Sequence, residues 1–389
     1  MLDIKNKNFY PKGRDSKDSD IAEIKDLINH LPLKRDMLIE YLHLIQDKYN
    51  QIRKKHLAAL ANLLKIPMAE AFEVATFYAH FDVIDDEDES LPPTTIRVCD
   101  SLTCELFGAN DLMKKLESTL DKKKVRVVRA PCMGLCDKAP ACEVGHNHLE
   151  KFSLKDVEKA LSKNEVHPKE VGGIDFSKYT QDDGYKTLLK CYEGKLSVDE
   201  VIDELNKSGL KGMGGAGFPS GQKWKFVRME KGPRLMTING DEGEPGTFKD
   251  KLYLETNMHK FFEGMLIAAW AVEAKKIYIY MRDEYPGIIK KMKNELTKLE
   301  NSKILREDTK IYVRRGAGAY ICGEESAMIE SIEGKRGLPR HKPPFVSKVG
   351  LFGKPTLNHN IETVYWVRDC LLYTSDAADE GLGVDIGGR

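Results

Sequence analysis

Residues 209–219 read GLKGMGGAGFP, and residues 239–246 read NGDEGEPG. The first segment holds five glycines in nine positions, so its backbone N–H groups can approach a large anionic ligand closely, and Lys223 follows to neutralise a phosphate. The second segment supplies polar groups suited to a sugar or to a heteroaromatic ring edge: Asn239, Asp241, Glu242 and Glu244. Together the two segments predict a nucleotide or flavin site.

Length and charge narrow the class of protein. The chain has 389 residues, which is enough for two or three domains. Lys plus Arg and Asp plus Glu both number 61, so no net charge favours nucleic acid or an acidic membrane. Residues 1–7 carry charges and no apolar run, and the apolar stretch 265–272 is too short to span a bilayer. We therefore expect a cytoplasmic protein without direct membrane insertion.

Composition shifts divide the chain into segments. We expect a disordered polar tail at 1–20, a helical subdomain at 21–84, a small α/β domain at 94–162, a linker at 163–196 and a larger α/β domain at 197–340. A further domain begins within 341–370. Residues 371–389 show neither helical nor strand periodicity, and we interpret them as a non-native tail.

Alternating strand and helix patterns support both α/β domains. In the first, we predict strands at 95–98, 125–128, 141–144 and 148–152 with helices at 109–120 and 156–161, an order typical of a thioredoxin-like fold. In the second, we predict strands at 234–238, 276–280 and 310–313 with helices at 260–274 and 286–300. This alternation favours a parallel or mixed sheet.

Four of the eight cysteines form two pairs, each following a predicted strand: Cys99 with Cys104, and Cys132 with Cys136. Four thiolates at the ends of neighbouring strands fit a [2Fe–2S] cluster, in which each iron takes two. Structural zinc is the alternative, although neither pair has the tight two-residue spacing that zinc sites favour. Unligated thiols are a third interpretation.

A third segment, RRGAGAYICGEE at 314–325, places Tyr320, Glu324 and Glu325 on a glycine-rich turn before a predicted helix. The glutamates could simply compensate the helix dipole. Phe218, Phe226 and Phe345 are candidates to stack an adenine, although core packing is the better explanation of each one alone.

These motifs resemble a known family. Residues 209–223, 239–250, 314–325 and 333–363 resemble the flavin-bearing subunit of respiratory complex I and the diaphorase subunits of NAD-reducing hydrogenases and NAD-dependent formate dehydrogenases. Residues 30–161 resemble the thioredoxin-like [2Fe–2S] subunit of the same complexes. The resemblance implies an N-terminal helical bundle, a thioredoxin-like [2Fe–2S] domain, a Rossmann-like FMN/NADH-binding domain and the start of a ubiquitin-like domain at 341–370.

The resemblance also implies roles for individual residues. The cluster would be held by Cys99, Cys104, Cys132 and Cys136. FMN would lie against Gly212, Gly214, Gly215, Gly217, Lys223, Asn239, Asp241, Glu242, Gly243, Tyr320, Gly323, Glu324 and Asn360. NAD(H) would contact Phe218, Phe226, Glu244, Glu325 and Phe345, with the two glutamates positioning it and favouring NAD over NADP.

Some positions depart from the family pattern. Met213 stands where arginine is usual, Gly240 where alanine is usual and His359 where asparagine is usual. The change at position 359 removes a side chain that the family pattern would place against FMN. The family also carries a cysteine motif for a [4Fe–4S] cluster in a C-terminal helical domain, and this chain ends before it.

Both modules lie on one polypeptide, which most resembles the beta subunit of an NAD-dependent formate dehydrogenase. We therefore expect an NAD(H)–FMN diaphorase subunit that passes single electrons to iron–sulfur clusters beside a molybdenum- or tungsten-containing alpha subunit. A complex I flavoprotein subunit and a hydrogenase diaphorase subunit are the alternatives. A nonenzymatic iron–sulfur scaffold that uses only residues 30–161 is a further one.

Overall fold

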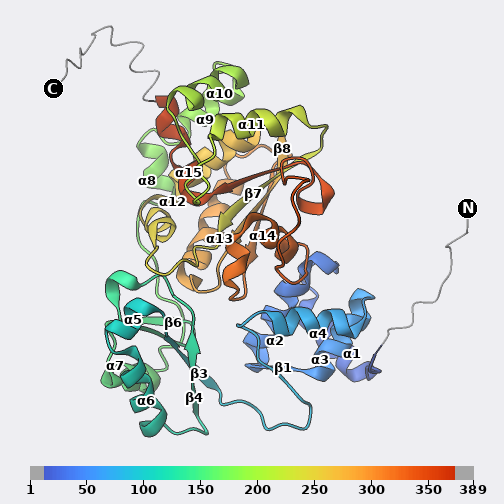
Figure 1. The fold of residues 1–389 in the computed structure, drawn as a ribbon, viewed down its shortest axis with the longest axis vertical. Helices are drawn as coiled ribbons and strands as arrows, with labels where there is room; N and C mark the ends of the chain where they lie inside the picture. The colour runs from blue at the N-terminus through green and yellow to red at the C-terminus, as the bar shows by residue number, and fades with distance from the viewer. Residues whose placement is uncertain (1–12, 373–389) are drawn as a thin grey trace, which may run out of the picture.

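The computed structural model describes residues 13–372 and folds them into three bodies (Figure 1). An N-terminal helical module and a thioredoxin-like domain lie next to each other below a larger α/β domain (Figure 1). The predicted non-native tail lies almost entirely outside the described residues. Within residues 13–372, no helix combines the length and the apolar character that crossing a membrane requires.

The helical module packs four helices around a buried aliphatic core: α1 (Asp18–Ile28), α2 (Leu38–Tyr49), α3 (Lys54–Leu64) and α4 (Met68–Phe77). A short 3₁₀ turn, η1 (Arg35–Met37), precedes α2, and β1 (Ile52–Arg53) pairs in parallel with β2 (Val83–Ile84). Helix α1 begins inside the segment predicted to be disordered, because Ile24 and Ile28 on its inner face are buried in this core.

The thioredoxin-like domain has a four-stranded sheet in the order β4-β3-β5-β6. Strands β3 and β4 are parallel, whereas β5 pairs antiparallel with both β3 and β6. Its elements are β3 (Thr94–Cys99), α5 (Leu102–Leu106), α6 (Ala109–Thr119), β4 (Val125–Ala130), η2 (Cys136–Lys138), β5 (Ala141–Val144), β6 (Asn147–Glu150) and α7 (Leu154–Ser162). The four strands and the helices α6 and α7 lie where the sequence predicted them along the chain, whereas the short helix α5 was not predicted.

The large domain has a four-stranded parallel sheet in the order β10-β7-β8-β9. Its elements are α10 (Val198–Lys207), α11 (Ser220–Met229), β7 (Arg234–Gly240), α12 (Lys249–Ala271), β8 (Ala274–Met281), α13 (Pro286–Glu300), β9 (Lys310–Arg315), η3 (Tyr320–Gly323), α14 (Glu325–Ile332), η4 (Leu351–Gly353), β10 (Thr356–Asn360) and α15 (Ile361–Tyr365). Because the strands are parallel, the loops that follow β7, β9 and β10 meet at one edge of the sheet.

The segment predicted to be a linker is folded and packs on the large domain. It contains α8 (Phe176–Gln181) and α9 (Lys186–Tyr192). Tyr179 donates to Glu263 at 2.6 Å, and Tyr185 lies 2.7 Å from Nδ1 of His259. These buried polar contacts fix α8 and α9 against α12, so the segment belongs to the large domain.

The prediction that a ubiquitin-like domain begins within 341–370 is wrong, because part of this segment belongs to the sheet of the large domain. Strand β10 pairs in parallel with β7 from Thr356↔Leu235 to Asn360↔Asn239. Residues 356–360 therefore form the edge strand of the large domain's own sheet, and the domain does not end at 340. The backbone pairing with β7 is what the sequence pattern could not reveal.

Candidate functional site

A cavity of about 520 Å³ opens at the carboxyl edge of the large sheet. Four segments far apart in the sequence line it: the glycine-rich loop before α11, the loop between β7 and α12, the turn η3 after β9, and the end of β10. The residues predicted to bind FMN that line this cavity are Gly214, Gly215, Asn239, Asp241, Glu242, Gly243, Tyr320, Gly323, Glu324 and Asn360. Glu244, predicted to position NAD(H), lines it as well.

Seven predicted site residues do not line this cavity: Gly212, Gly217, Phe218, Lys223, Phe226, Glu325 and Phe345. Lys223 lies 3.7 Å from Glu325, whose carboxylate also lies 3.2 Å from Lys342. The three phenylalanines are exposed, and the rings of Phe218 and Phe226 lie 6.0 Å apart. Exposed aromatic faces are available to a planar ligand, whereas core packing would have buried them.

The glycine-rich loop leaves room for a ligand. A Cβ atom at Gly214 would lie 3.2 Å from Cβ of Asn360, so a side chain there would narrow the cavity. Gly215 and Gly217 have φ of +108° and +64°, which L-residues with side chains adopt at a cost. The backbone in this loop therefore depends on glycine.

Glu242 stabilises the start of α12. Its carboxylate accepts the backbone N–H of Asp250 at 2.9 Å, that of Lys251 at 3.2 Å, and the hydroxyl of Tyr285 at 3.0 Å. The first N–H groups of a helix need such acceptors, so this glutamate holds the acidic loop against the helix.

Asp241 has a buried carboxylate oxygen without a partner. Its Oδ2 atom forms no hydrogen bond within residues 13–372, although the residue lines the cavity. Burial raises the pKa of Asp241 to about 7. A buried polar atom that lacks a partner is costly, so a hydrogen-bonding group of a ligand fits this position.

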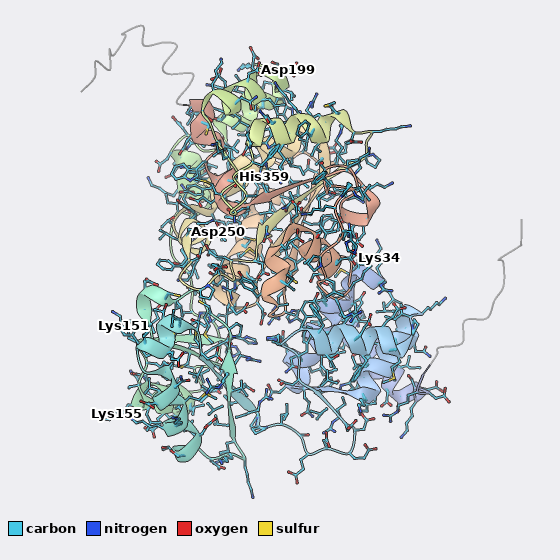
Figure 2. All side chains as sticks on the ribbon, viewed as in Figure 1. Lys34, Lys151, Lys155, Asp199, Asp250 and His359 are labelled. Carbon is cyan, nitrogen blue, oxygen red and sulfur yellow. The ribbon has the colours of Figure 1, made fainter. Side chains whose placement is uncertain are left out.

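The sequence did not single out Lys249 and Asp250, which complete the floor of the cavity. Lys249 Nζ lies 2.8 Å from Asp250 and 3.0 Å from Glu362. Asn360 donates to Asp250 at 2.6 Å and thereby ties the end of β10 to α12. Figure 2 shows Asp250 on the side of the large domain that faces the thioredoxin-like domain. In the sequence, the feature that could have identified these two residues is a Lys-Asp pair shortly after the acidic motif, where a helix begins.

Two further contacts shape the rim. The hydroxyl of Tyr320 donates to Glu244, and both side chains are exposed. Glu324 caps α14 by accepting the N–H groups of Ser326 at 2.8 Å and Ala327 at 3.0 Å. For Glu324, the helix-terminal role considered from the sequence is therefore present alongside its place in the cavity wall. Met213, Thr247 and Ile321 also line the cavity.

The positions that depart from the family pattern have local explanations. His359 is buried and accepts a hydrogen bond from Trp224 Nε1 at 2.7 Å; it precedes the last residue of β10 and does not line the cavity (Figure 2). Burial holds the pKa of His359 well below its usual value, which keeps the ring neutral. A Cβ atom at Gly240 would lie 2.5 Å from Sδ of Met281, so glycine accommodates this methionine.

The four predicted cluster ligands converge at the edge of the thioredoxin-like domain. Sγ of Cys132 lies 3.4 Å from Sγ of Cys136, and the thiol of Cys99 hydrogen-bonds with Cys104 and Cys132. The hydrogen bond with Cys99, together with burial, raises the pKa of Cys132 to about 12. Four thiols gathered at one edge of the domain form a donor set suited to iron, and metal binding releases their protons.

The acidic loop that lines the cavity also contacts the thiol cluster. The backbone N–H of Gly246, in the acidic loop, donates to Sγ of Cys136 at 3.3 Å. Arg282 is buried and donates to the carbonyl oxygens of both Cys132 and Glu242. One loop of the large domain thus contacts both sites.

Comparisons with known proteins agree with this geometry. Residues 205–369 match the family described as the Nuo51 FMN-binding domain, and residues 24–165 match the thioredoxin-like [2Fe-2S] ferredoxin family. A subunit of the NADH-quinone oxidoreductase of Aquifex aeolicus is 47% identical over 193 residues, covering 48% of this chain and 45% of that protein.

Two relatives match both modules at once. The NAD-reducing hydrogenase HoxS subunit alpha of Cupriavidus necator is 32% identical over 387 residues, covering 88% of this chain and 63% of that protein. A solved NAD+-reducing [NiFe]-hydrogenase in the H2-reduced state superposes with a TM-score of 0.74 at 26% identity, covering 87% of this chain and 62% of that chain. The chain thus spans about half to two thirds of the length of these relatives.

The cavity fits FMN, because its glycine-rich wall and the unpartnered Asp241 oxygen suit a phosphate-bearing ring ligand, and the four thiols fit a [2Fe–2S] cluster. The chain therefore joins a thioredoxin-like [2Fe–2S] ferredoxin domain to a Nuo51-type FMN-binding domain on one polypeptide.

Proposed function

We propose that this chain is the diaphorase subunit of a larger NAD-linked oxidoreductase. It would exchange hydride between NAD(H) and FMN and single electrons with iron–sulfur clusters. The observation that carries this proposal is the hydrogen bond from Gly246 to Cys136, because it puts the thiol cluster against the loop that lines the flavin cavity. FMN, when bound, supplies the conversion between two-electron and one-electron chemistry.

The chain's own residues position the ligands. The glycine-rich loop and Lys223 would hold the phosphate, and Asp241 would receive a polar edge of the ring. Glu244 is exposed at the rim and would meet the nicotinamide nucleotide, held by Tyr320. Glu325 is already paired with Lys223 and Lys342, so we assign the preference for NAD over NADP mainly to Glu244.

The test uses the anaerobically purified chain loaded with FMN and its cluster. NADH should bleach the flavin absorbance, and dithionite should produce the EPR signal of a reduced [2Fe–2S] cluster. The variant Cys132→Ser should lose the cluster signal and keep flavin bleaching. A chain that binds FMN but is not reduced by NADH would contradict the proposal.

For the larger enzyme we propose two candidates. Formate dehydrogenase follows from the fusion of both modules, with a molybdenum- or tungsten-containing partner. The match across both modules to a hydrogenase subunit favours an NAD-reducing hydrogenase as the second. Purification of the native complex through this chain separates them, because molybdenum or tungsten with formate-dependent NAD reduction identifies the first, and nickel with H2-dependent reduction identifies the second.

A further inference from the structure

One buried arginine lies between the flavin cavity and the thiol cluster. Arg282 directly follows β8, an inner strand of the large sheet, so its backbone is fixed at the carboxyl edge. The residue is 3% exposed. Its Nη1 donates to the carbonyl oxygen of Glu242, in the loop that lines the cavity, and its Nη2 donates to the carbonyl oxygen of Cys132. The guanidinium therefore contacts the main chain of a cluster cysteine from inside the protein.

Tyr285 holds this guanidinium against the loop that carries Cys132 and Cys136. The tyrosine ring lies 5.0 Å from Cζ of Arg282, and its hydroxyl donates to Glu242 at 3.0 Å. A Cβ atom at Gly134, between the two cysteines, would lie 2.2 Å from the hydroxyl oxygen, so the tyrosine packs directly on that loop. The arginine is thus enclosed beside the cysteines and has little freedom to turn toward water.

The positive charge of Arg282 is only partly compensated. Burial opposes the charge, but the carboxylate of Glu284 more than offsets this, and the pKa of the guanidinium is raised. Glu284 lies 3.3 Å from both Nη2 and Nε, and its side chain is 15% exposed against 3% for the arginine. Water therefore screens the carboxylate more than the guanidinium. Asp241 also acts on Arg282, but burial raises its pKa to about 7, so it is partly protonated near neutral pH.

We propose that Arg282 is a positioning residue whose charge raises the reduction potential of the [2Fe–2S] cluster. The proposal rests on the proposed function only in requiring that the four thiols hold this cluster. Reduction adds one negative charge, and a buried cation next to a ligand residue stabilises that charge. Arg282 acts through the carbonyl oxygen of Cys132, and it would make the cluster a better acceptor for electrons from the flavin site.

A purely structural role predicts something different. An arginine that only satisfies two carbonyl oxygens can be lost at a cost in stability, while the potential of the cluster stays where it is. A charge that acts on the cluster shifts the potential according to its sign, whichever residue of the Arg282–Glu284 pair is changed. The potential therefore separates the two roles.

The experiment is an EPR-monitored redox titration of the anaerobically purified chain with FMN and its cluster bound. Arg282→Gln removes the charge and keeps a hydrogen-bond donor. It should shift the reduction equilibrium of the cluster at least tenfold toward the oxidised form, a fall of about 59 mV or more for one electron. Arg282→Lys keeps the charge and should retain most of the wild-type potential.

Two further variants change charge without touching Arg282. Glu284→Gln removes the compensating carboxylate and should shift the equilibrium about threefold or more toward the reduced cluster. Arg129→Gln is the matched control. Arg129 lies three residues before Cys132 and pairs with Asp100 at 3.9 Å, but its side chain is 56% exposed. Water screens that charge, so the equilibrium should stay within about twofold of the wild type.

Three results would overturn the proposal. They are an unchanged potential in Arg282→Gln, a fall in Arg282→Lys as large as in Arg282→Gln, or the absence of a rise in Glu284→Gln. The last measurement decides the question even if Arg282→Gln fails to assemble its cluster. A wild-type chain without a [2Fe–2S] signal would overturn the cluster assignment and this proposal with it, whereas a normal signal with unshifted potentials overturns this proposal alone.

Discussion

At the scale of single residues, the cavity depends on glycine, because a side chain at some positions would fill the space that a ligand needs. A Cβ atom at Gly214 would press on Asn360 and occupy space that a ring ligand needs. Asn360 is in turn held by Asp250, so the neighbour has little freedom to move. The consequence can be measured with a single added methyl group.

Gly214→Ala should lower the affinity for FMN about tenfold, or ~1.4 kcal/mol, because the methyl group overpacks the cavity wall. Quenching of flavin fluorescence during titration of the flavin-free protein measures this. Gly172→Ala is the control, since a Cβ atom there meets nothing within 4 Å. Equal affinities of the two variants would remove Gly214 from the binding surface.

Asp241 predicts a pH dependence. Burial raises its pKa to about 7 from 3.8, so the folded, flavin-free protein favours the protonated carboxyl. Its contribution to stability is complete below about pH 4 and is lost as pH rises through 7, roughly 2–4 kcal/mol in total. Asp241→Asn should therefore gain most over the wild type at pH 8 and less than half as much at pH 5, as urea denaturation would show. A constant difference between the two proteins would contradict this assignment.

At the scale of elements, sequence patterns located most strands but misjudged where some elements begin. Helix α12 starts at Lys249, eleven residues before the predicted helix at 260–274. The apolar run marks only the part after Asn257, whose φ of −148° interrupts the helix. The first part is polar and is capped by Glu242 from a preceding loop, so no local pattern announces it.

The sequence motifs pointed to most of the residues that line the cavity. Two further lining residues, Lys249 and Asp250, were recognised only from their contacts in the structure. The three glycine- and acid-rich segments converge on one cavity. The residue types of the first two segments predict a nucleotide or flavin site. Lys249 and Asp250 join them through contacts with Asn360 and Glu362, which lie more than a hundred residues away. Contacts between residues so far apart in the chain produce no pattern in a single sequence, so they could not be predicted from it.

Helix α12 also crosses α15 at very close range. A Cβ atom at Gly264 would lie 1.8 Å from the carbonyl oxygen of Val364, which is backbone and cannot rotate away. Gly264→Ala should therefore cost about 3 kcal/mol or more of unfolding free energy, despite the better helix propensity of alanine. Urea denaturation measures the loss. Gly172→Ala should stay within about 1 kcal/mol of the wild type, and a neutral Gly264→Ala would mean that the two helices can separate.

At the scale of the whole molecule, arginines join the three bodies. Arg126 of the thioredoxin-like domain forms a two-pronged pair with Asp82, next to β2 of the helical module, at 2.9 and 2.5 Å. Arg282 connects the large domain to the thiol cluster through the carbonyl oxygen of Cys132. Arg314 of β9 pairs with Asp36 at 2.8 Å and Glu40 at 2.9 Å in the helical module. Guanidinium groups suit such junctions because they satisfy two acceptors at once.

Arg314 provides the sharpest test of these junctions, because it is buried at the interface beside the half-buried Glu40. Burial raises the pKa of Glu40 even beside the guanidinium, so removing Arg314 leaves a carboxylate that is costly to keep charged. Arg314→Gln should lose about 3 kcal/mol of unfolding free energy at pH 8. The loss should shrink in acid, where Glu40 takes up a proton.

A double-mutant cycle separates the ion pair from simple packing. Adding Glu40→Gln to Arg314→Gln should restore part of the lost stability, because it removes the stranded charge. Lys275→Gln breaks an exposed pair with Asp308 and should change stability by less than about 1 kcal/mol. If the double variant is as unstable as the two single losses added together, Arg314 and Glu40 do not stabilise each other, and the contribution of Arg314 at this junction comes from its other contacts, such as the pair with Asp36.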